Sequence, residues 1–438
     1  MPEADPQRSA GFFGWKNVVL LFFIYGAVYG FVFYGFTVVF PEMIRAQGWS
    51  RGDASVAHTL RALSLGALAP LVAFAVGKIG AKRTMIAGLS FGVVVLGILG
   101  TVTSQLWHWI LLWGILMPVS FSFGGAIPIQ TTLTYWFNVR RATALGIVLS
   151  AAAFGGFVAA PLYTLIMREA GTWRAGWLAA GTFCALALVC SLFMKSKPAD
   201  IGQFPDGIDP DDASDTANSA TSGKARTYRT SESWALREVL RKPVLYLLGI
   251  CMVAQLSSVY LLTTHGVLHL TDLGFTRMEA ASVLGNLILF SGFARLPIGF
   301  VGDRIEPRWI MMVALSGMAM ALAGIWKAPE DLGVLLVIVA IFGFCFGAIV
   351  PIFPAIIGNY FGPPAFAPII GFLSPFMILI GAPVPLVAGI IYDRFQSYDI
   401  AFIYVVALTF VCALLASALV PPKKAKPMAP PSPPSPGS

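Results

Sequence analysis

Long apolar runs, each of about 20 residues or more, alternate with short polar segments along almost the whole chain. Inside a bilayer core about 30 Å thick the backbone finds no water to bond, so a chain crosses it as a helix of roughly 20 apolar residues. The pattern therefore predicts twelve membrane-spanning helices, at residues 16–40, 54–77, 84–104, 108–134, 142–167, 174–194, 243–268, 278–301, 309–326, 332–358, 365–391 and 399–420.

The predicted helices fall into two halves that resemble each other at an offset of 225 residues. FAVGKIGAKR at 74–83 aligns with GFVGDRIEPR at 299–308, and the segment at 135–146 aligns with that at 359–371. Repeated halves are a common architecture of secondary transporters. We therefore expect an all-α membrane protein of two pseudo-symmetric six-helix bundles. The expected divisions are an N-terminal tail at 1–15, bundles at 16–194 and 243–420, a linker at 195–242 and a disordered tail at 421–438.

Composition and charge agree with a membrane protein. Hydrophobic residues make up 57% of the chain and charged residues 11%, which is too apolar for a soluble domain of this size. The net charge of +8 is spread over short loops, so nucleic acid is not an expected partner. More than twice as many of the 29 lysines and arginines fall on the side of the termini as on the other side. This bias predicts cytoplasmic termini, in a cell inner (plasma) membrane.

One short loop carries a motif known from a transporter family. Gly299-x-x-x-Asp303-Arg304, after the eighth predicted helix, resembles the conserved inner-loop motif of the major facilitator superfamily. The resemblance implies that Asp303 and Arg304 help to gate the inner side. The equivalent loop of the first half carries Lys78 in place of the acid, and we place Lys78 with Asp303 and Arg304 among the gating candidates.

Four further patterns resemble the monocarboxylate porter and oxalate:formate antiporter branch of that superfamily. They are Gly14-Trp15, Gly48-Trp49-Ser50-Arg51, Tyr135-Trp136-Phe137 with Arg140-Arg141, and Tyr360-Phe361-Gly362. The resemblance implies a small organic anion, most simply a monocarboxylate, as the transported substrate.

Arg295 is the central candidate for binding that anion. It lies eight residues before Asp303, so about 12 Å deep at 1.5 Å per residue. An arginine at this depth needs a partner, and no acid lies at mid-depth in any predicted helix. A carboxylate substrate would supply that partner through charge-assisted hydrogen bonds. The alternative is that Arg295 bonds backbone carbonyls near Pro297. The branch resemblance favours substrate binding, because its members carry a substrate-binding arginine on the eighth helix.

The residues around Arg295 leave both proton symport and anion exchange open as coupling mechanisms. Proton-coupled members of the branch often carry an acid one turn before that arginine, where this chain has Ser291. Exchangers carry a lysine on the eleventh helix, and residues 365–391 have none. A proton or a counter-anion is therefore only a possible partner. Polar side chains that could contact the substrate, or instead hold helices together, are Tyr25, Tyr29, Gln130, Gln255 and Ser291.

Arg61 is the second arginine within a predicted span, near the outer third. It is either a snorkelling side chain, an outer attraction site for anions or a second clamp for a dicarboxylate. His265 and His269, one helical turn apart, lie at the outer end of the seventh span. We place His265 with Arg61 in an outer vestibule, and the alternative for the histidine pair is a structural role. Two histidines do not make a metal site.

The sequence thus favours a monomeric carrier that alternates access for a small organic anion across the lipid bilayer. A drug/proton antiporter and a non-transporting membrane sensor are the alternatives. No enzyme motif, metal ligand cluster or cofactor motif is found, so neither enzymatic activity nor a cofactor is expected.

Overall fold

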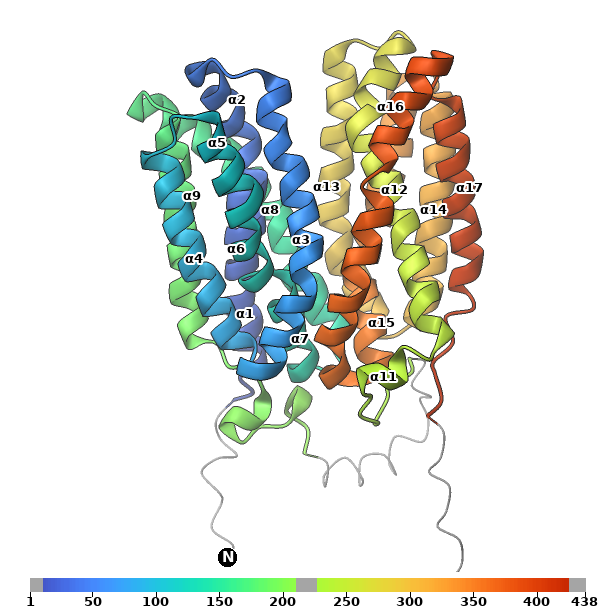
Figure 1. The fold of residues 1–438 in the computed structure, drawn as a ribbon. Coiled ribbons are helices and arrows are strands. Elements are labelled where there is room, and N and C mark those ends of the chain that lie inside the picture. The colour runs from blue at the N-terminus through green and yellow to red at the C-terminus, as the bar shows by residue number, and fades with distance from the viewer. Residues whose placement is uncertain (1–10, 210–226, 425–438) are drawn as a thin grey trace, which may run out of the picture.

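The structure is a computed structural model that describes residues 11–209 and 227–424 (Figure 1). The rest of the predicted tails and linker, residues 1–10, 210–226 and 425–438, lies outside the described residues. The described residues form helices and connecting segments, with no strand among them. The prediction of an all-α membrane protein is confirmed.

The chain runs the length of the first half six times, and two of these six crossings contain a π-helical stretch. The first crossing joins α1, η2 and α2, and the fourth joins α5, η3, α6 and α7. In η2, Gly30 packs against Gly155 of α8, because only glycine allows the two backbones to approach so closely. The elements are α1 (Gly14–Tyr25), η2 (Gly26–Tyr34), α2 (Phe36–Gln47), α3 (Arg51–Ile79), α4 (Ala81–Thr101), α5 (Leu106–Trp109), η3 (Ile110–Leu116), α6 (Met117–Phe123), α7 (Ala126–Trp136), α8 (Arg141–Ala170) and α9 (Arg174–Phe193).

The second half also crosses six times, and two of its crossings are merged in one long helical stretch. Leu332–Phe395 comprises 64 residues, about 96 Å at 1.5 Å per residue, and is too long for one span. It turns at Gly362, whose φ of 75° is accessible to glycine at little cost, before Pro363 and Pro364. The elements are η4 (Pro198–Ile201), η5 (Pro205–Gly207) and α11 (Leu236–Val239) in the linker, then α12 (Pro243–Asp272), α13 (Arg277–Gly302), α14 (Pro307–Lys327), α15 (Leu332–Gly381), α16 (Val384–Phe395) and α17 (Asp399–Ala416).

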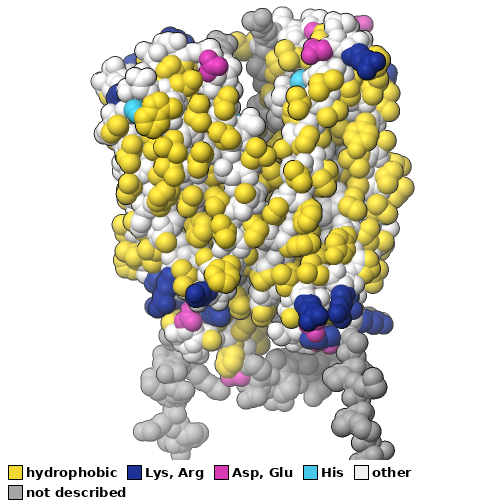
Figure 2. Space-filling view, viewed as in Figure 1, with side chains coloured by type: hydrophobic (Ala, Val, Ile, Leu, Met, Phe, Trp, Pro, Cys, Tyr) yellow, Lys and Arg dark blue, Asp and Glu magenta, His cyan; other side chains and the backbone are white. Residues whose placement is uncertain are grey.

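The two halves meet most closely at the end of the molecule where the linker lies, here called the linker end. In Figure 1 they stand apart at the opposite end, where α3 and α13 diverge. The two most extensive pairings between them are α8 on α13 and α3 on the second leg of α15, and α7 and α8 also contact α15. Figure 2 shows apolar side chains covering the middle of the face in view, with lysines and arginines gathered below them at the linker end.

Candidate functional site

Arg295 lies on α13, where the two halves meet, and its side chain is 5% exposed. Its Nη1 donates to the backbone oxygen of Leu149 on α8, 2.5 Å away. Its Nη2 is 3.4 Å from the hydroxyl of Ser291, one turn earlier on the same helix. Arg295 therefore ties the halves together, through a carbonyl of α8 and not through one near Pro297.

This guanidinium is incompletely partnered. Its Nε is buried and has no hydrogen-bond partner among the described residues. None of the ion pairs in the described part of the chain involves Arg295. A buried cation without a counter-charge is costly, so the site favours an anion.

Two predicted site residues lie beside Arg295, and a third joins them through a ring contact. Ser291 is 2% exposed and accepts the weak hydrogen bond from Arg295. Tyr25 of α1 is buried and interacts electrostatically with Arg295. Its ring centroid is 4.5 Å from that of Tyr29. The structure thus brings together Arg295, Ser291 and Tyr25, with Tyr29 one step away.

The hydroxyl of Tyr29 is hydrogen-bonded to backbone groups at the interruption between α6 and α7. It donates to the oxygen of Phe121 at 3.3 Å and accepts from the amide of Ala126 at 3.2 Å. These groups flank the interruption between α6 and α7, so Tyr29 satisfies polar backbone that the break leaves free. Because the hydroxyl is engaged in this way, the ring is the part of Tyr29 that faces its aromatic neighbours Tyr25 and Phe33.

The two predicted glutamines share no hydrogen bond with Arg295 in the described residues. Gln130 of α7 is half-buried. Gln255 of α12 is 3% exposed, and its Oε1 is buried without a partner among the residues described. An unsatisfied amide oxygen can accept a hydrogen bond from a substrate hydroxyl, so Gln255 is the stronger candidate of the two.

The outer candidates differ in how fully they are bonded. His265 contacts the hydroxyl of Tyr398 at 3.2 Å and the oxygen of Pro385 at 2.8 Å, so both ring nitrogens are engaged in joining helices. Arg61 of α3 is half-buried, and its Nε and Nη1 have no partner among the described residues. Of these two, only Arg61 has donors available for a ligand.

Asp303 holds the halves together at the linker end. Its carboxylate accepts the amides of Ala142, at 2.8 Å, and Thr143, at 3.0 Å, which begin α8. An acid is favourable there because it meets free N–H groups and the positive end of the helix dipole. Burial raises the pKa of the Asp303 carboxyl, while these hydrogen bonds and the charge of Arg229 oppose the rise. The desolvation cost thus offsets part of the stabilisation that these hydrogen bonds provide.

The other two predicted gating residues make no bond between the halves in the described chain. Arg304 lies over the ring of Phe300, with its Cζ 3.5 Å from the centroid. Lys78 lies over the ring of Phe74, with its Nζ 5.8 Å from the centroid. Both contacts are within one half.

Another polar contact between the halves, and the contacts that the linker makes with both, were not predicted from the sequence. Arg141, which is 2% exposed, donates from Nη1 to the side-chain oxygen of Asn359 at 2.6 Å. From the linker, Arg229 donates from Nη2 to the oxygens of Val139 and Asp303, one in each half. The only sequence signal was the Arg140-Arg141 pair, which marked a family pattern and not a partner.

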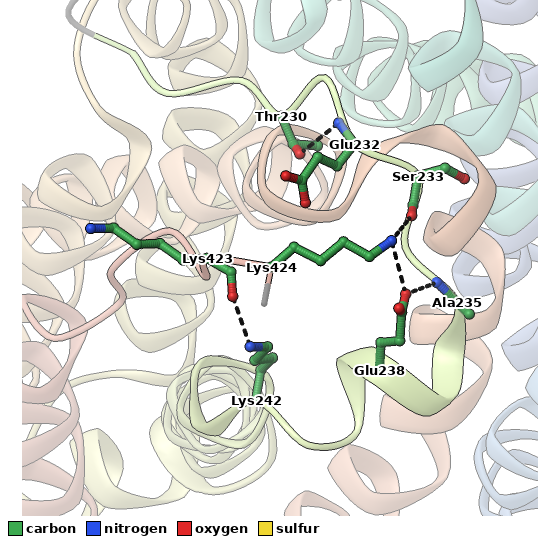
Figure 3. Close-up of polar contacts among 8 residues, drawn as sticks. All are labelled: Thr230, Glu232, Ser233, Ala235, Glu238, Lys242, Lys423 and Lys424. Atoms are coloured by element: carbon green, nitrogen blue, oxygen red, sulfur yellow. Dashed lines mark hydrogen bonds and ion pairs between the residues drawn. The ribbon is translucent and has the colours of Figure 1, made fainter. Parts of the chain in front are cut away.

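The linker is also fastened to the second half and to the C-terminal segment. Figure 3 shows Lys424 pointing between the oxygen of Ser233, at 2.7 Å, and the carboxylate of Glu238, at 3.4 Å. Beside it, Lys242 donates to the oxygen of Lys423 at 2.8 Å. The residues that follow α17 therefore help to hold the linker under the second half.

A family model decides what kind of protein this arrangement belongs to. The model described as Major Facilitator Superfamily matches residues 22–291 and 267–436, most of the chain. The chain belongs to this superfamily. It is a multi-pass membrane transporter of a small molecule, and not an enzyme.

Similar sequences and structures agree with this superfamily. Monocarboxylate transporter 12 of Xenopus laevis is 24% identical over 64% of this chain, which spans 62% of that relative's length. Monocarboxylate transporter 13 of Rattus norvegicus is 23% identical over 92% of this chain and 87% of its own. The structure of the proton:xylose symporter XylE has a TM-score of 0.73 at 10% identity, covering 93% of this chain and 96% of its own. The transporter FucP, in the outward conformation, has a TM-score of 0.70 at 13% identity, covering 92% and 98%.

Proposed function

We propose that this major facilitator transporter carries a small organic anion, most simply a monocarboxylate, and that Arg295 binds its carboxylate. The observation that carries the proposal is the buried guanidinium of Arg295, which has no acidic partner and a free Nε in the described chain. The similarity to monocarboxylate transporters 12 and 13 supports the same class of substrate.

The arrangement supports alternating access. Arg295 bonds Leu149 in the other half, so the contact between the halves and the substrate-binding group are the same side chain. A carboxylate that takes over the guanidinium would compete with the Leu149 carbonyl and thereby change how firmly the halves hold together. We propose that the bundles at 16–194 and 243–420 move as two units around this point, within a monomer.

The orientation follows from charge. Lysines and arginines gather at the linker end, which supports a cytoplasmic linker end with both termini inside, in a plasma membrane. The halves are joined there by Asp303 and by Arg141, so the structure fits a state closed to the cytoplasm. Its likeness to FucP in the outward conformation supports this state.

The residues near Arg295 constrain how transport is coupled. Ser291 cannot carry a proton as a carboxylate would, and residues 363–395 contain no lysine for a counter-anion. Transport driven by the anion's own gradient, or by exchange at Arg295 itself, fits this site better than proton symport through position 291.

The test is uptake of labelled lactate, pyruvate, oxalate and formate into proteoliposomes, with and without a pH gradient and with internal anion. We expect saturable uptake by the wild type. Loss of one partner of a desolvated charge pair typically costs about 2 kcal/mol or more, so Arg295→Gln should lower uptake roughly 30-fold or further. Stimulation by internal anion would identify exchange, and stimulation by a proton gradient would identify symport.

A matched control removes an arginine away from the site. Arg168 is 74% exposed and pairs with its neighbour Glu169, so Arg168→Gln should transport like the wild type. Unchanged uptake by Arg295→Gln would make Arg295 structural. Uptake of cationic drugs instead of any carboxylate would favour a drug/proton antiporter, and binding without flux would favour a sensor.

A further inference from the structure

A second group of free hydrogen-bond donors lies away from Arg295, on α3. The Nδ1 of His58 accepts from the indole Nε1 of Trp113 at 3.3 Å. Because an indole only donates, the neutral imidazole carries its proton on Nε2. That Nε2 is buried without a partner among the described residues, as are Nε and Nη1 of Arg61, one turn along the helix. Three buried donor nitrogens within one turn of α3 therefore lack an acceptor among the described residues.

Aromatic rings surround these donors. The Cζ of Arg61 is 4.3 Å from the ring centroid of Phe33 and 5.7 Å from that of Trp113. The His58 ring is 4.4 Å from that of Phe36. Cation–π contacts hold a guanidinium in place without using its N–H groups, so the donors stay available. We call these five residues the Arg61 cluster.

Both π-helical stretches supply this cluster. Phe33 belongs to η2 and Trp113 to η3, and η3 packs directly on α3. π-Helical segments re-aim side chains and occur often at functional sites. A cluster built from two of them is unusual for a side chain that only reaches toward the membrane surface.

The cluster faces the other half of the transporter. Arg61 interacts electrostatically with Tyr260 of α12, across the space between the halves. Its place on α3, ten residues after Arg51, is about 15 Å from the end opposite the linker. The guanidinium is thus set where an anion arriving from that end would pass.

The Arg61 cluster and Arg295 lie at different depths. Arg61 is 18 residues before Ile79, about 27 Å from the linker end, whereas Arg295 is about 12 Å from it. Both side chains lean toward the N-terminal ends of their helices, hence in the same direction, so the difference remains. A dicarboxylate as small as oxalate is too short to bridge it.

An aromatic row on the first crossing connects the two arginines. Tyr25, beside Arg295, is followed by Tyr29 at 4.5 Å and by Phe33 at 6.1 Å from Tyr29, measured between centroids. Phe33 then contacts Arg61. The row gives the substrate's apolar part a surface to follow between the two cations.

We propose that Arg61 and His58 form an outer carboxylate-binding site, distinct from Arg295, that holds the anion before it moves to Arg295. The proposal rests on the proposed function, because it assumes that the cargo is a carboxylate. Of the alternatives for Arg61, this proposal favours an outer attraction site for anions over a second clamp that would bind a dicarboxylate together with Arg295.

The test combines binding and transport for wild type, Arg61→Gln, Arg295→Gln and the double variant. Scintillation-proximity binding with labelled lactate, pyruvate and oxalate should show that Arg295→Gln keeps a weak class of bound anion that the double variant lacks. In uptake, loss of a charge-assisted hydrogen bond should raise KM for Arg61→Gln about tenfold, with Vmax within about twofold. Arg61→Lys, which keeps the charge, should recover part of both signals.

Arg45→Gln is the charge-matched control. Arg45 lies at the same end, is 74% exposed and pairs with Glu42, so its loss should leave binding and KM unchanged. Binding unaffected by Arg61→Gln, with all binding lost in Arg295→Gln, would overturn the outer site and leave the proposed function intact. Oxalate binding abolished by either single change would indicate one shared site and overturn the separation. Binding insensitive to Arg295→Gln but lost in Arg61→Gln would overturn the proposed role of Arg295 alone, and no binding of any anion to the wild type would overturn both.

Discussion

The two seams between the halves are equivalent in the repeat but differ in what holds them. At the seam of α8 and α13, here the Asp303 seam, a carboxylate accepts two amides of the facing helix. At the seam of α3 and the second leg of α15, here the Lys78 seam, the matching position 225 residues earlier is a lysine. It lies over a ring of its own half and makes no hydrogen bond or ion pair across the seam in the described chain. That seam is packed by Gly371 against Ala73.

The facing helix explains why the acid is absent from the Lys78 seam. Thr143, whose amide bonds Asp303, is matched by Pro368, and the residues just before α8 are matched by Pro363 and Pro364. Proline has no N–H, so an acid at position 78 would meet fewer donors. In the described chain one seam is therefore closed by hydrogen bonds as well as close packing, and the other by close packing without a hydrogen bond between α3 and α15.

The largest free-energy change at the seams should come from a glycine-to-alanine substitution, which adds one methyl group where two helices touch. In Gly146→Ala the new carbon would meet the backbone oxygen of Arg295 and lie 3.0 Å from Cα of Gly299, so the helices must part. Overpacking of this kind costs about 1–3 kcal/mol. Uptake should fall about tenfold, and thermal unfolding in detergent should occur at lower temperature.

The Lys78 seam offers a matched experiment. There the atom nearest to a new methyl group at Gly371 belongs to a side chain and not to the backbone. A methyl at Gly371 would lie 2.6 Å from Cβ of Ala73, so Gly371→Ala should also impair the protein. Adding Ala73→Gly should restore most of the loss, because the next nearest atom is the backbone oxygen of Ala69 at 3.1 Å. At Gly146 the three nearest atoms are all backbone atoms, so no side chain can be trimmed there. A Gly146→Ala variant with normal stability and uptake would show that the two backbones are not in contact.

The next largest free-energy change should come from removing the carboxylate of the Asp303 seam. Asp303→Ala leaves the first amides of α8 without an acceptor when the halves are closed, and loss of such a cap costs about 0.5–2 kcal/mol. The population open at the linker end should therefore rise up to about 30-fold. Electron–electron distances between spin labels at Arg83→Cys and Trp309→Cys, exposed positions in the two halves, would measure it in a cysteine-free background.

Lys78→Ala is the control at the equivalent position. Since Lys78 makes no bond across its seam in the described chain, the distance distribution should match that of the wild type. Equal opening in the two variants would mean that the seams are held alike, contrary to the comparison above.

The parts of this picture that the sequence could predict depend on position along a single helix. The spans, the depth of Arg295 and the absence of a mid-depth acid all follow from hydropathy and spacing. The bond from Arg295 to Leu149 joins residues 146 apart, and that from Arg141 to Asn359 joins residues 218 apart. No local pattern specifies which distant helix faces which, so these hydrogen-bond partners could not be predicted from the sequence. The Nδ1 contact of His58 with Trp113 was missed for the same reason.

The smallest effect should come from the linker contact that lies outside both seams. Glu238 and Lys424 are 3.4 Å apart and partly exposed, and surface ion pairs contribute little. Glu238→Gln should change uptake by less than about twofold. The hydrogen bond from the amide of Ala235 holds the pKa of the Glu238 carboxyl below its usual 4.5, with Lys424 adding to the effect. The contact is thus fully present above pH 4.5 and is lost as the pH falls through the lowered pKa. Spin-label distances that change in the wild type when the pH is lowered from 7 to below 4.5, but not in Glu238→Gln, would show that this contact controls the halves.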